Sequence, residues 1–304
     1  MTYPSLAPLL TGGKAALARA LARIEAAPDA DDVVDLLSAA YAAPRAHVIG
    51  ITGPPGVGKS TLLNALISTW RRAGRTVAVI AVDPSSRRSG GALLGDRTRL
   101  RTDPEDQGIF VRSMAARDRL GGLAGLTVAA MVLMRALYDV VLIETVGVGQ
   151  SETDVVGVAD TVVFCVQPGS GDSLQFMKAG IAEIPHVVVV TKADMDQAAK
   201  RARADVLGGL SLAESEPGWD IPVLMVSSQR RDGIAELMAQ LDRHRTWLTG
   251  SGRLDPLRHG QAEQWLVEAV RERFGREGVR RAGDLSLSAG ASPFHRLAEL
   301  ARRL

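Results

Sequence analysis

Short runs of Val and Ile alternate with segments of helix length through the middle of the chain. The runs cover residues 47–52, 76–83, 139–144, 161–167, 186–191 and 222–227. The helix-length segments between them include residues 59–73, 123–137 and 232–248. Almost continuously apolar strands joined through helices are typical of a parallel sheet that is buried on both faces. The pattern therefore predicts an α/β fold with a doubly wound, mostly parallel sheet.

The two ends of the chain have a different pattern. Residues 17–41 carry apolar side chains at helical spacing until Pro44, which predicts an N-terminal helical extension. Gly and Pro are frequent in residues 249–256, a helical stretch follows at 259–274, and the basic tail after Gly275 is typical of a partly mobile arm. We expect three regions, which are the N-terminal helical extension (1–45), a central domain (46–248) and a C-terminal helical arm (249–304).

Composition narrows the classes of function. The 304 residues include 36 basic and 34 acidic side chains, and a net charge of +2 does not indicate a nucleic-acid partner. The longest uncharged run, 120–134, is shorter than the roughly 20 residues that span a bilayer, and residues 1–13 lack the features of a signal peptide. The single cysteine, Cys165, allows no disulfide framework. We expect a cytoplasmic protein without a membrane or nucleic-acid partner.

A glycine-rich segment between the first predicted strand and the next helix matches the pattern GxxxxGK[ST]. In such a loop, successive backbone N–H groups point at phosphate oxygens and the helix N-terminus adds positive potential. The lysine reaches the β- and γ-phosphates, and the hydroxyl of Ser60 is available to Mg²⁺. We expect a P-loop that binds a nucleoside triphosphate through Gly53, Pro54, Pro55, Gly56, Val57, Gly58, Lys59, Ser60 and Thr61.

Acidic residues follow two of the predicted strands and one of the loops. Mg²⁺ prefers near-octahedral oxygen ligands, so Ser60 needs one or two carboxylates at neighbouring strand ends. Asp83 ends the second run, Asp96 lies in the loop after it, and Glu144 ends the third run. These four residues are the candidate ligands of Mg²⁺, although acids are also common in turns.

The base of the nucleotide is predicted from the segment Thr191-Lys192-Ala193-Asp194 at the end of another strand. A carboxylate at Asp194 accepts both N1–H and the exocyclic amine of guanine, and adenine does not offer that pair of donors. Lys192 would lie over the base. The loop Ser227, Ser228 and Gln229 follows the last strand and would give a backbone N–H to guanine O6. The sequence therefore predicts GTP and GDP as substrate and product.

The motifs together resemble one family, the MeaB-type GTPases that are associated with methylmalonyl-CoA mutase, also labelled ArgK, in the SIMIBI class of P-loop proteins. The resemblance is carried by residues 53–61, by 82–86 with 90–91 and 95–99, by 144–152 and by 168–172. It implies a homodimeric P-loop GTPase that is a chaperone of an adenosylcobalamin-dependent acyl-CoA mutase, where it gates cofactor loading and protects the mutase. The C-terminal arm is the region expected to form the dimer.

The resemblance also assigns roles to residues. Mg²⁺ would be held by the residues that match Ser60, Asp83, Asp96 and Glu144, and the switch segments would correspond to residues 87–101, 147–154 and 169–180. The third switch contains Lys178, which would stabilise phosphate or contact the mutase. Two positions depart from the family pattern, because Thr191 stands where Asn is usual and Phe176 where Gly is frequent.

Hydrolysis would proceed by in-line attack of water, with Lys59, Mg²⁺ and backbone donors absorbing the developing charge. Lys59, Asp96, Gln150 and Lys178 are the catalytic candidates. Gln150 would either orient the water or contact the partner, and no general base stands out. We therefore expect slow intrinsic turnover that a partner accelerates.

Three other functions are compatible with parts of the sequence. One is a kinase, as the ArgK label suggests, although no acceptor site is evident. Another is a nickel-insertion GTPase, which needs clustered Cys and His ligands, whereas Cys165, His47, His186 and His244 stand at positions typical of structural residues. The third is a binding module that holds nucleotide without turnover, and phosphate release distinguishes it from an enzyme.

Overall fold

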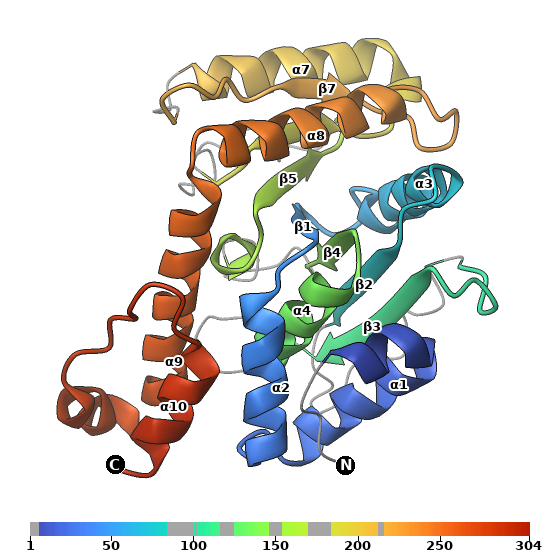
Figure 1. Ribbon diagram of the computed structural model, residues 1–304. Helices are drawn as coiled ribbons and strands as arrows, with labels where there is room; N and C mark the ends of the chain where they lie inside the picture. Colours follow the sequence, from blue (N-terminus) through green and yellow to red (C-terminus); the bar gives the residue numbers. More distant parts are fainter. Residues whose placement is uncertain are drawn as a thin grey trace, which may run out of the picture.

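A single seven-stranded sheet forms the centre of the protein (Figure 1). The computed structural model describes residues 6–83, 100, 102–115, 125–145, 154–169, 184–211 and 216–304. All paired strands are parallel, and their order is β3-β2-β4-β1-β5-β6-β7. The strands are β1 (His47–Thr52), β2 (Val77–Asp83), β3 (Ile109–Ala115), β4 (Val140–Glu144), β5 (Thr161–Val166), β6 (Val187–Val190) and β7 (Val223–Met225). The prediction of a doubly wound parallel sheet is confirmed, with one edge strand, β3, that was not predicted.

Helices cover both faces of this sheet. One face packs against α1 (Ala7–Ala26), α2 (Asp31–Ala42), α4 (Gly125–Leu137), α7 (Gln197–Leu210) and the 3-10 turn η1 (Val155–Gly157), and the other against α3 (Lys59–Arg72) and α8 (Ile234–Gly250). Strand residues alternate between the two cores, so Val48 belongs to the α2 and α4 side and Ile49 to the α3 side. This alternation is the two-residue period of a β-strand, and it explains why the strands are apolar at nearly every position.

The N-terminal extension is a pair of helices that belongs to the main core. The predicted helical region divides between Ala26 and Asp31, around Pro28, into α1 and α2. Leu17 and Leu21 of α1 and Leu36 and Leu37 of α2 are buried together with α4 and one face of the sheet. Burial of these side chains against α4 is the main stabilisation of both helices, because isolated helices of this length are marginal in water.

The C-terminal region forms a long arm that leaves the sheet after α8. Helix α9 (Leu254–Ala282) continues from α8 with a break at Gly275 (φ 69°), and α10 (Pro293–Ala301) returns to pack beside α2 and α9 (Figure 1). Buried apolar residues of the tail, among them Leu285, Leu287 and Leu300, form a core with α9. The tail after Gly275, which we expected to be a partly mobile arm, is thus a packed helical element.

None of the helices in the described ranges is long and apolar enough to cross a membrane.

Three of the five histidines gather at the amino ends of the central strands, at the opposite end of the sheet from the P-loop. The Thr161 hydroxyl lies 2.6 Å from His47 Nε2 and 2.7 Å from His244 Nδ1. His186 Nδ1 accepts from Val162 N at 2.9 Å, and its ring lies 4.4 Å from that of His244. Burial lowers the pKa of His47 to about 3, of His186 to about 4 and of His244 to about 2. All three rings are therefore neutral in the folded protein at pH 7.

These histidines make the fold sensitive to acid. Their pKa values are near 6.5 in the unfolded chain, so below that pH the unfolded state binds more protons and the free energy of unfolding falls. Between pH 6.5 and 5.5 each histidine is expected to remove about 1 kcal/mol, because the unfolded imidazole goes from half protonated to almost fully protonated over this interval. We expect His244→Phe to lose about that much less than the wild type over this interval, measured by urea unfolding at both pH values. An equal loss in the two proteins would show that His244 is not held neutral.

Candidate nucleotide-binding site

The P-loop connects β1 to α3 and contains glycines that no other residue can replace. An added Cβ at Gly53 (φ 132°) would lie 2.3 Å from the backbone oxygen of Cys165 in the neighbouring strand β5. Gly56 and Gly58 also have positive φ values of 75° and 103°. L-residues rarely adopt such values, and this backbone turns successive N–H groups toward one side of the loop. The local fold therefore matches the predicted phosphate cradle.

Lys59 begins α3, and its side chain folds back over the loop. The ammonium donates to the carbonyl oxygens of Gly53 at 2.6 Å and Pro54 at 3.0 Å, and the residue is only 6% exposed. These bonds hold the cation inside the ring of backbone atoms that would surround the β- and γ-phosphates. The position is the one that the GxxxxGK[ST] pattern predicts.

Two of the predicted metal ligands meet beside the P-loop. Ser60 Oγ donates to Glu144 Oε1 at 2.7 Å, although the two residues are 84 positions apart in sequence. The contact arises because β4, which ends at Glu144, pairs directly with β1, which leads into the P-loop. Asp83 is the last residue of β2, the strand on the other side of β4. The Ser60 hydroxyl in the first turn of α3 and the Glu144 carboxylate at the end of β4 form a set of hard oxygen donors, which fits Mg²⁺.

Several predicted site residues lie outside the part of the chain that the structure describes. These are Asp96, Gln150 and Lys178, together with Phe176 and most of the three predicted switch segments. The side chain of Asp83 is also outside the description. Their roles stay predictions.

The predicted guanine-binding residues come together from two segments of the chain. Asp194, in the 3-10 turn η3 (Ala193–Met195), accepts a hydrogen bond from Ser227 Oγ at 2.7 Å. This hydrogen bond makes the largest contribution to lowering the pKa of Asp194, so the carboxylate is ionised at neutral pH. Ser228 and Gln229 follow in the turn that the Ser227–Asp232 bridge closes. The structure thus brings the base-binding loop next to the serine loop, as the strand ends predicted.

Lys192 joins the base-binding loop to the P-loop. Its ammonium donates to Gly56 O at 3.1 Å and to Gln167 Oε1 at 2.5 Å. Gln167 directly follows β5 and was not among the predicted site residues, although it ends the apolar run 161–167. The side chain of Lys192 therefore bridges the two loops, which places its stem between the predicted phosphate and base positions.

Thr191, which replaces the usual Asn, also fastens the two loops together. Its buried hydroxyl lies 2.7 Å from Val57 O in the P-loop and 3.0 Å from Val166 O in β5. A hydroxyl has one proton, so it donates to one of these carbonyls at a time or shares the proton between them. The altered position thus keeps a brace between the base-binding segment and the P-loop.

Comparisons with known proteins identify relatives of this chain. The family model described as Methylmalonyl Co-A mutase-associated GTPase MeaB matches residues 17–281. A Pyrococcus abyssi protein named "Putative GTPase" is 45% identical over 230 residues, which cover 74% of this chain and 71% of that protein. The GTPase ArgK of Escherichia coli is 39% identical over 228 residues, which cover 74% and 69% of the two chains.

A solved structure described as a LAO/AO transport system kinase has the same overall fold. It superposes with a TM-score of 0.68 at 28% sequence identity and covers 98% of this chain and 95% of its own. The P-loop, the Ser60–Glu144 contact and the Asp194 loop lie within the residues matched by the family model. The chain therefore belongs to the methylmalonyl-CoA mutase-associated GTPases of the MeaB family.

Proposed function

We propose that the chain hydrolyses GTP with Mg²⁺ and uses this cycle as a chaperone of an adenosylcobalamin-dependent acyl-CoA mutase. The structural observation that supports the chemistry is the 2.7 Å contact between Ser60 and Glu144 beside the P-loop. The observation that supports the mutase role is the family match over residues 17–281, whose description names a methylmalonyl-CoA mutase. Gating of cofactor loading and protection of the mutase would be the tasks of that cycle.

Each described residue of the site has a distinct task in this proposal. The backbone N–H groups of the P-loop bind the phosphates, and Lys59 turns from the Gly53 and Pro54 carbonyls to the phosphate oxygens that gain charge. Ser60 and Glu144 would hold Mg²⁺, which neutralises charge on the β- and γ-phosphates when bound. Asp194 accepts from guanine while Ser227 keeps its carboxylate oriented.

The decisive experiment is phosphate release from GTP and from ATP, with and without a purified cobalamin-dependent acyl-CoA mutase. Selective turnover of GTP that rises when the mutase is added supports both parts of the proposal. Selective turnover that the mutase leaves unchanged would keep the GTPase and remove the mutase as its partner. Tight GTP binding without any phosphate release would instead support a nucleotide-binding module.

The homodimer is proposed separately, with residues 249–304 as its contact. A variant that lacks these residues would be a poor test of the dimer contact. Their removal would also expose the face of α2 on which α10 packs. Light scattering of the full chain across a concentration series is the better measurement. A mass of one chain at all concentrations would contradict the dimer.

The nickel-insertion alternative has little support in the described residues. They contain no group of three or more His, Cys, Asp or Glu side chains that could hold a metal ion. Cys165 is buried, and burial raises the pKa of its thiol to about 12, which leaves it protonated and a poor ligand. Equilibrium dialysis with Ni²⁺ would test this alternative, and stoichiometric binding would revive it.

Base selectivity gives a further prediction. In Asp194→Asn, the amide offers a donor where guanine also has donors, so GTP binding is expected to weaken by about 10- to 100-fold. Xanthine carries an oxygen in place of the exocyclic amine, so XTP is expected to bind the variant better than GTP does. Calorimetric titration with both nucleotides measures the change. Asp196→Asn, two residues further on, is the matched control and is expected to keep the preference for GTP.

A further inference from the structure

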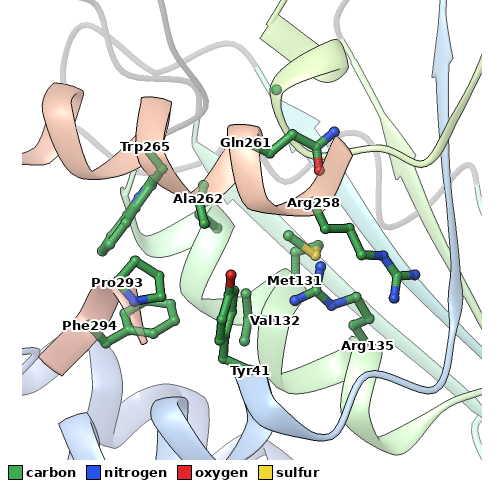
Figure 2. Close-up of a pocket in the computed structure, with 12 residues that line it drawn as sticks. Tyr41, Met131, Val132, Arg135, Arg258, Gln261, Ala262, Trp265, Pro293 and Phe294 are labelled. Carbon is green, nitrogen blue, oxygen red and sulfur yellow. The ribbon is translucent and has the colours of Figure 1, made fainter. Parts of the chain in front are cut away.

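A small pocket lies far from the P-loop, where α2, α4, α9 and α10 meet (Figure 2). Its volume of about 20 Å³ admits a single small group. Its polar lining consists of Tyr41, Arg135, Arg258 and Gln261, and Met131, Val132, Trp265, Pro293 and Phe294 are among its apolar and aromatic neighbours.

Arg135, on α4, brings a buried positive charge without a direct ion-pair partner among the described residues into this pocket. The residue is only 4% exposed, and its Nε is buried without a hydrogen-bond partner in the described ranges. Within those ranges its guanidinium makes no ion pair either, and its central carbon lies 5.8 Å from the centre of the Tyr41 ring. Burial and, to a smaller extent, the charge of Arg258 lower the pKa of Arg135 to about 10. The side chain is nevertheless cationic at neutral pH.

The neighbouring carboxylate, Asp160, favours the charged form of Arg135 at a distance but does not bond to it, because other groups bind both of its oxygens. Asp160 Oδ1 accepts from Arg258 Nε at 2.8 Å. Its Oδ2 accepts from Arg258 Nη2 at 2.7 Å and from Val48 N at 2.8 Å. Both oxygens of Asp160 are thus bonded to Arg258 and Val48, and neither forms a hydrogen bond with Arg135. A buried charge without a partner is costly, which makes the pocket a strong anion attractor.

A second buried donor lines the same pocket. The indole Nε1 of Trp265 has no hydrogen-bond partner among the described residues. The amide nitrogen of Gln261 already donates to Val156 O at 2.8 Å and to Ala159 O at 2.9 Å. Buried polar groups in native proteins nearly always have partners, so each of these donors indicates that an acceptor is missing beside it. A carboxylate is an acceptor at both oxygens and carries the required charge.

A larger cavity adjoins the pocket and determines the shape of the ligand. It has a volume of about 520 Å³ and shares Val128, Gly157, Gln261 and Trp265 with the small pocket. The shared wall includes the indole and the Val128 side chain, which suit an apolar group. A ligand whose charged end enters the small pocket can therefore extend its carbon chain along this wall.

We propose that the pocket is a binding site for a small organic carboxylate, whose charged end contacts Arg135 and whose apolar chain lies along Trp265 in the larger cavity. The site is independent of the GTP site and of the mutase role. It lies against η1 and α9, so an occupied site would stiffen the junction between the central domain and the arm.

Thermal unfolding with acetate, butyrate and the neutral butyramide, at constant ionic strength, tests the proposal. At ten times its dissociation constant a ligand favours the folded state about 11-fold, which raises the midpoint temperature. Butyrate is expected to act at lower concentration than acetate, and butyramide is expected to have no effect. Arg135→Met, which keeps the volume and removes the charge, is expected to abolish the shift, and the exposed-site control Arg201→Met to retain it.

A second measurement does not depend on the stability of the variant. In NMR spectra of the wild type, the indole N–H signal of Trp265, identified by its loss in Trp265→Phe, is expected to shift when butyrate is added. A response to butyramide equal to that of butyrate would overturn the assignment of charge recognition. The absence of any shift in both measurements, or an equal shift in Arg135→Met, would show that the donors are satisfied by water alone.

Discussion

Replacement of Lys59 with alanine is expected to reduce GTP turnover by about 10²- to 10³-fold, the scale seen when one preorganised donor to a developing charge is removed. The ammonium is nearly buried and bonded to two carbonyls of the P-loop, so it is held next to the phosphates before the reaction. A preorganised charge of this kind stabilises the transition state more than the bound substrate, so the rate constant should fall more than GTP affinity does.

Single-turnover phosphate release separates these two effects, because it reports the chemical step at saturating enzyme. Lys200→Ala is a suitable control, since Lys200 is exposed on α7 and belongs to no part of the site. Thermal unfolding of both variants checks that the loop still folds without the two bonds of Lys59. A Lys59→Ala variant that is folded and turns over GTP at the wild-type rate would contradict the assigned task of this residue.

The site could be predicted from the sequence where its residues are local or lie at strand ends. The P-loop is a contiguous segment, and its glycines have the positive φ values that the motif requires. Asp194 and Ser227 are 33 residues apart, yet both follow parallel strands, β6 and β7, that pair directly. Because parallel strands end at the same edge of the sheet, residue motifs that follow two predicted strands were expected at that edge, and the pairing of β6 with β7 makes them neighbours.

Elements with mixed patterns were harder to predict. Strand β3 was missed because Arg112 and Ser113 interrupt its apolar residues. These polar side chains are tolerated because β3 is the edge of the sheet and is only partly covered. The packed tail was missed because it is basic and because Gly and Ser interrupt its apolar residues, several of which, such as Leu285 and Leu300, are buried against α9.

Contacts between segments that are far apart in the chain could not be predicted from the sequence. Arg258 of α9 and Asp160 before β5 are 98 residues apart, and neither belongs to a motif. Gly50 is a second example, because a glycine inside a predicted strand indicates only that the strand is less stable there. In the structure an added Cβ at Gly50 would lie 2.2 Å from Val155 of η1, so its absence allows η1 to pack directly on β1. Both features fasten the segment that follows residues 146–153 to the body of the protein.

The Arg258–Asp160 pair is the main polar connection between the arm and the central domain. The two side chains are 11% and 2% exposed, and Arg258 Nη2 also donates to Ala46 O at 2.9 Å. A second pair, Arg273–Asp29, connects α9 to the loop between α1 and α2, but its side chains are 38% and 52% exposed. The two pairs join the same helix to the body of the protein and differ mainly in burial, which makes them a matched comparison.

Asp160→Ala is expected to lower the free energy of unfolding by about 3–5 kcal/mol, because it leaves Arg258 buried without a counter-charge and Val48 N without its acceptor. Asp29→Ala is expected to cost about 1 kcal/mol or less, since an exposed pair contributes little. Urea unfolding of both variants at pH 7 measures the difference. The double variant Asp160→Ala/Arg258→Met is expected to recover part of the loss, because it removes the stranded charge. Equal costs at positions 160 and 29 would show that water reaches the Arg258–Asp160 pair, and the arm would then be held mainly by the apolar contacts of α9 and α10.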